Sequence, residues 1–83
     1  MLKIKDNVDL KELEKFGYEQ EYEYEEYLYA KYFEYSGTKI FIFPNKEIVQ
    51  GEFIIFFGYN EVELEKKFIN DLIEAGLVEK VKE

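Results

Sequence analysis

The amino-acid sequence predicts a small α+β domain in the order α-β-β-β-α, in which an antiparallel sheet of three to four strands is flanked by an N-terminal and a C-terminal helix. Three observations predict it. Helix-capping signals stand near both ends of the chain, the middle is rich in aromatic and β-branched residues, and 83 residues suffice for one domain, residues 1–83. A short extra strand at either terminus is compatible with this order.

The first helix is expected over residues 10–16. Asp9 is a good N-cap, Glu12 stands three residues later as its capping-box partner, and Gly17 occupies the position where a left-handed residue ends a helix. Two turns are marginally stable alone in water, so the apolar side of this helix must pack on the rest of the domain.

The second helix is expected over residues 61–75. Asn60 is its cap, and Gly76 follows its last turn. Apolar residues recur between them at spacings of three and four, at Leu64, Phe68, Ile69, Leu72 and Ile73. The segment after Gly76 could add a strand or fold back onto the domain.

The region between the helices is predicted to form strands. Residues 27–35 and 39–43 are joined by a turn at 36–38, and Pro44 begins the next turn. Residues 47–50 and 52–57 form either one strand with a bulge at Gly51 or two short strands. The apolar run 53–57 has the length of a buried strand.

Composition excludes several classes of function. The chain has no histidine, cysteine or arginine, so zinc sites, thiol nucleophiles and Ser-His-Asp catalysis are ruled out. A net charge of −8 argues against direct nucleic-acid binding. The glutamates are too numerous and too exposed to suggest a catalytic pair, so we expect no enzyme activity, no cofactor and no metal. With no signal-peptide pattern and no long apolar stretch, we expect a cytoplasmic protein that does not bind membranes.

The unusual segment is residues 18–35, which contain seven of the eight tyrosines, six glutamates and one lysine. In an extended conformation, Tyr22 and Tyr24 would share one face and Glu21, Glu23 and Glu25 the other. The alternation breaks at Glu25-Glu26, which predicts a bulge or a turn there. A helical conformation, with Tyr22, Tyr29 and Phe33 on one side, is an alternative.

Two interpretations of this segment stand side by side. The tyrosines could pack one face of the sheet while the glutamates are simply solvated. Alternatively, the tyrosines exceed what one small core can bury and serve as interface anchors, with carboxylates that attract a basic partner. Carboxylates spaced ~6–7 Å apart along a strand resemble a line of phosphates, so the surface could mimic a nucleic acid.

Residues 4–18, beginning Ile4-Lys5-Asp6-Asn7-Val8-Asp9, and residues 71–81, beginning Asp71-Leu72-Ile73-Glu74-Ala75-Gly76, resemble the ends of short uncharacterised proteins of phages and prophages of Gram-positive bacteria. Small acidic phage proteins commonly bind and disable a host protein. By analogy, anti-CRISPR and other anti-defence inhibitors, several of which mimic nucleic acids, are the relevant precedent.

The sequence therefore leads to two hypotheses. The first is a non-catalytic inhibitor that docks on a basic, nucleic-acid-binding host protein, such as a CRISPR effector. Its binding residues would be Glu19, Glu21, Tyr22, Glu23, Tyr24, Glu25, Glu26, Tyr27 and Tyr29. The alternative is a structural domain that forms a homo-oligomer through exposed tyrosines or an edge strand and inhibits nothing.

Overall fold

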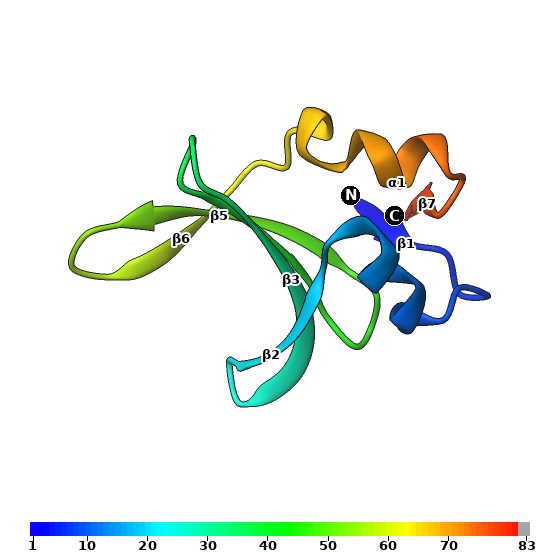
Figure 1. The fold of residues 1–83 in the computed structure, drawn as a ribbon, viewed down its shortest axis with the longest axis horizontal. Helices are drawn as coiled ribbons and strands as arrows, with labels where there is room; N and C mark the ends of the chain where they lie inside the picture. The colour runs from blue at the N-terminus through cyan, green and yellow to red at the C-terminus, as the bar shows by residue number, and fades with distance from the viewer. Residues whose placement is uncertain (82–83) are drawn as a thin grey trace.

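Residues 1–81 are mostly β-structure, with two 3₁₀ helices and one short α-helix (Figure 1). The computed structural model describes residues 1–81. Its elements in chain order are β1 (Leu2–Ile4), the 3₁₀ helix η1 (Leu10–Phe16), β2 (Glu19–Glu23), β3 (Glu26–Phe33), β4 (Thr38–Ile42), β5 (Ile48–Ile54), β6 (Gly58–Val62), the 3₁₀ helix η2 (Lys66–Ile69), α1 (Asn70–Glu74) and β7 (Val78–Lys80).

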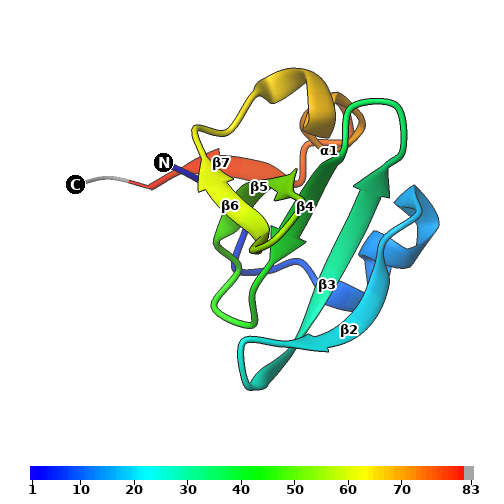
Figure 2. The same cartoon turned by 90° about the vertical axis from the view of Figure 1, so that its left-hand side faces the viewer.

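Strands β2 to β6 form one antiparallel meander in which each strand pairs with the next along the chain (Figure 2). Because the turns of a meander alternate between the two ends of the sheet, the β2–β3 and β4–β5 turns lie at one end, and the β3–β4 and β5–β6 turns lie at the other. Strands β1 and β7 pair separately, with Ile4 opposite Val78. An isolated bridge from Lys3 to Glu47 connects this small ribbon to the chain just before β5.

The main core lies on one face of the meander. Ile40 and Ile42 of β4 are fully buried there beneath Ile4 of β1, Leu13 of η1 and Leu72 of α1. The opposite face bears a second, smaller cluster of Leu28, Ala30 and Phe41, bordered by Phe43, Val49 and Tyr59. All the helical segments therefore cover one side of the sheet.

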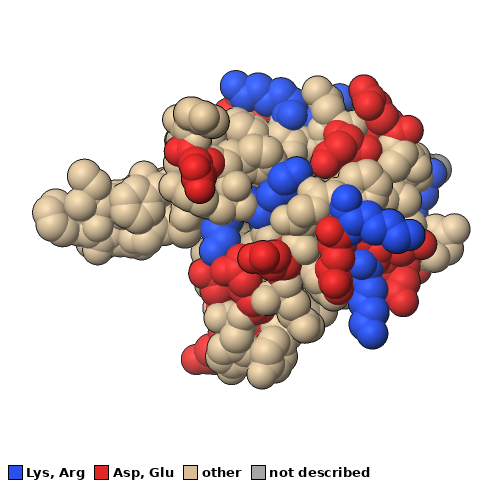
Figure 3. Space-filling model, viewed as in Figure 1, with Lys and Arg blue, Asp and Glu red and all other residues tan. Residues whose placement is uncertain are grey.

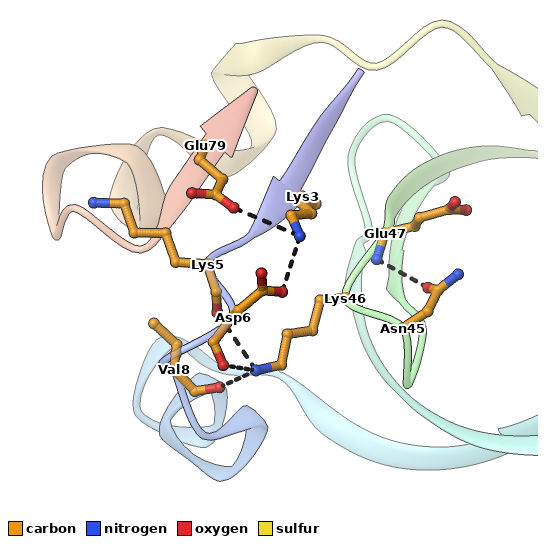
Figure 4. Close-up of polar contacts among 8 residues, drawn as sticks. All are labelled: Lys3, Lys5, Asp6, Val8, Asn45, Lys46, Glu47 and Glu79. Atoms are coloured by element: carbon orange, nitrogen blue, oxygen red, sulfur yellow. Dashed lines mark hydrogen bonds and ion pairs between the residues drawn. The ribbon is translucent and has the colours of Figure 1, made fainter. Parts of the chain in front are cut away.

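Lys46 connects the β4–β5 turn to the loop that follows β1 through hydrogen bonds (Figure 4). Its Nζ donates hydrogen bonds to the carbonyl oxygens of Asp6 at 2.6 Å and Val8 at 2.8 Å, and lies 3.5 Å from that of Lys5. Its own carbonyl accepts from the Ile4 amide at 2.8 Å. Beside it, Asp6 and Glu79 both lie within ion-pair distance of Lys3.

The predicted α-β-β-β-α fold with two flanking helices is wrong. Over the described part of the chain, residues 1–81, there are seven strands in two sheets and one α-helix of five residues. The first expected helix is present only as the 3₁₀ helix η1. Its ends match the sequence signals, because Asp9 accepts from the Lys11 amide and Gly17 has a φ of 89°.

The helix expected over 61–75 begins only at residue 66, because its first residues belong to the sheet. Val62 pairs with Gln50 in β5. Gln50, which is fully buried, also accepts a 2.8 Å hydrogen bond from the Glu65 amide and donates to the Glu65 carboxylate at 3.3 Å. Strand pairing and the pairing of a buried amide thus outweigh the local helix preference of residues 61–65.

Two further expectations fail in β5 and the chain after it. Gly51 is not a bulge, since it pairs in register with both Lys39 and Glu61. It is glycine because a Cβ there would lie 3.0 Å from the Phe41 ring and 3.1 Å from the Tyr59 Cβ. Residues 53–57 are not a buried strand. They form the end of the β5–β6 hairpin and are exposed.

Candidate binding surfaces

The glutamate- and tyrosine-rich segment folds into the β2–β3 hairpin, whose tip we call the tyrosine hairpin (residues 22–27). The turn consists of Tyr24 and Glu25, which have φ angles of 53° and 62°. Two positive φ angles between paired Glu23 and Glu26 are the geometry of a type I′ turn, which usually contains Asn and Gly. The sequence therefore predicted the position of the turn to within one residue. It did not predict the turn's conformation, which is unfavourable for the Tyr and Glu side chains found there.

Three tyrosines are exposed on the tyrosine hairpin, with 62%, 61% and 64% of the surface of Tyr22, Tyr24 and Tyr27 accessible. Tyr22 and Tyr27 pack edge to face at 4.9 Å between ring centroids. Tyr24 contacts the rings of Phe41 and Phe43 on the other side of the sheet. Tyr22 and Tyr24 consequently do not share a face, contrary to the simple alternation expected from the sequence.

Tyr29 lies outside this exposed group. It is 7% exposed, belongs to the main core and donates a 3.0 Å hydrogen bond from its hydroxyl to the Glu14 carboxylate. Burial, together with that carboxylate, raises the pKa of Tyr29. The structure places it as a core residue that positions η1 against β3.

The five glutamates divide into two sets. Glu21 and Glu23 lie 2.8 Å and 3.5 Å from Nζ of Lys39, which is nearly buried between the rings of Phe41 and Tyr59. Burial acts to lower the pKa of Lys39, but the hydrogen bond to Glu21 and the charge of Glu23 leave it raised. These two carboxylates are held within the protein.

The other set, Glu19, Glu25 and Glu26, is exposed to solvent. Glu25 and Glu26 lie at the tip among the exposed tyrosines, and Glu19 begins β2. No salt bridge involves any of the three within residues 1–81. They are therefore the carboxylates of the predicted set that are free to meet a partner.

A second surface was missed by sequence reasoning. Residues Phe53–Phe57, which we call the apolar finger, end the β5–β6 hairpin, and their exposed fractions run from 37% to 87%. Figure 3 shows this hairpin as a projection at the left that is free of charged residues. Residues 53–60 include no charged residue at all. A usable signal was Gly58, a turn-prone residue that ends the apolar run and begins the second strand of the hairpin, Gly58–Val62.

Within residues 1–81, no group of three or more acidic side chains is arranged to hold a metal ion. None of the helices in that range is both long and apolar enough to span a bilayer. Comparisons of the chain with protein-family models, with curated proteins and with solved structures find no match.

Proposed function

We propose that this is a non-catalytic binding protein of the phage type, which docks its tyrosine hairpin on a basic protein in the host cytoplasm and thereby inhibits it. The observation that supports the proposal is the group of three tyrosines, each more than 60% exposed, beside the free carboxylates of Glu25 and Glu26. Tyrosine is enriched among the residues that dominate binding energy at interfaces.

The backbone of the turn supports the same assignment. Tyr24 and Glu25 both occupy the left-handed region, which costs non-glycine residues about 1–2 kcal/mol each. Asn-Gly would form the same turn without this strain. Strained residues that persist at an exposed turn are a reason to propose a function there.

Charge determines the kind of partner. Residues 18–35 contribute six glutamates and one lysine, so the hairpin would attract a basic surface and repel an acidic one. A nucleic-acid-binding protein fits this charge because its binding groove is basic, as phosphate binding requires. Because Lys39 binds Glu21 and Glu23, the tyrosines rather than the charges would supply most of the affinity.

Affinity capture from host lysate, followed by titration of the purified partner, tests the proposal. We expect the double change Tyr22→Ala and Tyr27→Ala to weaken binding by at least about 30-fold, as for two interface anchors. Glu25→Gln with Glu26→Gln should slow association and flatten its dependence on salt. Glu12→Gln with Glu74→Gln is the matched control, because it removes the same charge from exposed positions outside the hairpin. If the affinity for the partner changed neither with salt concentration nor in the two hairpin variants, the proposal would be refuted.

A further inference from the structure

The apolar finger exposes a large, continuous apolar patch. Phe56 and Phe57 are 87% and 84% exposed, and Ile55 is 78% exposed. With Phe53 and Ile54, the finger presents about 600 Å² of apolar surface, at the upper end of the range for a patch on a typical monomer. The tyrosine hairpin lies at the opposite end of the meander, so its proposed role does not explain the finger.

An apolar groove lies at the same end of the sheet as the finger. It is shallow and open, with a volume of about 460 Å³. The rings of Tyr32, Phe33, Tyr35 and Phe68 line it, and Glu34, Ser36 and Lys67 lie at its rim. Tyr35 belongs to the β3–β4 turn, which is joined to the finger by a 3.0 Å hydrogen bond from the Phe53 amide to the Gly37 carbonyl. The finger and the groove thus lie next to one another on each molecule.

We infer that the protein forms a two-fold symmetric dimer in which the finger of each copy enters the groove of the other. Area favours this arrangement over contact between two fingers. A ribbon lying against another ribbon buries one of its sides, about 300 Å², whereas a stable dimer needs about 800 Å² per copy. A finger seated in the groove buries one of its sides and the groove surface beneath it. Symmetry makes this contact twice, so each copy buries both a finger side and a groove, which is more than two fingers in contact would bury.

Charge also favours a second copy over a lipid surface. Between Lys46 and Lys66 the chain has five glutamates and no basic residue, whereas segments that lie on membranes typically carry Lys or Arg. Glu52 and Glu61, which border the finger, would instead meet Lys67 at the rim of the partner's groove. Lys67 is free to exchange partners, because its 3.3 Å pair with Glu65 is exposed and therefore weak.

Analytical ultracentrifugation between about 1 and 100 μM tests the inference directly. The expected species has twice the chain mass of 10.1 kDa, and added salt should strengthen it, because salt screens the repulsion between two chains of charge −8. Binding of the basic partner proposed above should respond to salt in the opposite direction, so the two ideas can fail separately. A monomer at every concentration and salt level would overturn the dimer.

Variants identify the contact. Phe56→Asp removes one anchor from each copy and should weaken the dimer by at least about 100-fold. Circular dichroism should show the fold intact, since Phe56 is 87% exposed. Tyr27→Ser, a similarly exposed aromatic on the tyrosine hairpin, is the matched control and should leave the dimer unchanged. A dimer that survives Phe56→Asp would refute the role of the finger.

Mixing two defective variants tests the groove. Tyr35→Asp, at a fully exposed position on the groove wall, should also give monomers. Mixed with Phe56→Asp it should recover a heterodimer, because the intact finger of one variant meets the intact groove of the other. Absence of recovery would refute finger-in-groove contact. Co-sedimentation of monomer with phosphatidylcholine vesicles, lost in Phe56→Asp, would assign the finger to lipid instead and overturn the inference.

Discussion

Replacing Lys46 tests whether a single side chain holds the β4–β5 turn to the N-terminal loop. Lys46→Ala removes charge-assisted hydrogen bonds of 2.6 Å and 2.8 Å to the Asp6 and Val8 carbonyls (Figure 4). Such bonds to charged groups contribute about 1.5–3 kcal/mol each when buried, and the ammonium here is only partly buried, so we expect a loss of about 2–3 kcal/mol in total. For a domain of this size that lowers the melting temperature by roughly 10–20 °C.

A glycine at the same position separates the side chain from the backbone. Lys46 has a φ of 75°, so Lys46→Gly loses the same hydrogen bonds but relieves about 1 kcal/mol of left-handed strain. Lys46→Gly should therefore be more stable than Lys46→Ala by about 1 kcal/mol and still less stable than wild type.

Urea unfolding followed by circular dichroism measures all three free energies of unfolding, with Lys11→Ala as an exposed control that should stay within about 0.5 kcal/mol of wild type. If Lys46→Ala also stayed within that range, or if Lys46→Gly were the less stable of the two, the reasoning would be wrong.

Three other changes test the local geometry by the same measurement. Glu25→Gly, at a φ of 62°, should stabilise the protein by about 0.5–1 kcal/mol while weakening partner binding; a loss of stability would contradict the strain at the turn. Gly51→Ala should cost about 1–3 kcal/mol, because its Cβ would press on the Phe41 ring and the Tyr59 Cβ; a neutral result would mean that these groups move freely. Tyr18→Phe should be neutral or stabilising by about 1 kcal/mol, because the buried Tyr18 hydroxyl has no hydrogen-bond partner among residues 1–81. Burial raises the pKa of Tyr18 well above its usual range, so the folded protein keeps a proton that the unfolded chain releases above about pH 10. Wild-type stability should therefore fall as the pH rises past 10, and Tyr18→Phe should lessen the fall. If the stability of wild type and of Tyr18→Phe fell equally with pH, Tyr18 would not be the group responsible.

Sequence patterns predicted the features that depend on neighbours along the chain. The Asp9 cap, the left-handed Gly17 and the turn near Glu25 each need only a few residues, and all three are present. The prediction of a helix over 61–75 was wrong because the groups that compete for its first residues lie far away in the sequence. Gln50 takes the Glu65 amide, and pairing of β6 with β5 takes residues 58–62.

For the same reason, the sequence predicted only part of the candidate binding surfaces. The abundance of tyrosine and glutamate identified the β2–β3 hairpin, but not that Lys39 would bind Glu21 and Glu23 or that Tyr29 would be buried. The run Phe53–Phe57 has the composition of a core strand. Whether such a run is covered depends on which elements reach it, and the β5–β6 hairpin projects beyond the helical segments (Figure 1).

The alternation of turns along the meander has a consequence for valency. Because the tyrosine hairpin and the apolar finger lie at opposite ends of one sheet, occupation of either leaves the other accessible. A dimer joined by finger-in-groove contacts would leave both of its tyrosine hairpins accessible. Such a dimer could engage two sites on an oligomeric or repetitive target, and its apparent affinity would then exceed that of one hairpin by the effective concentration of the second.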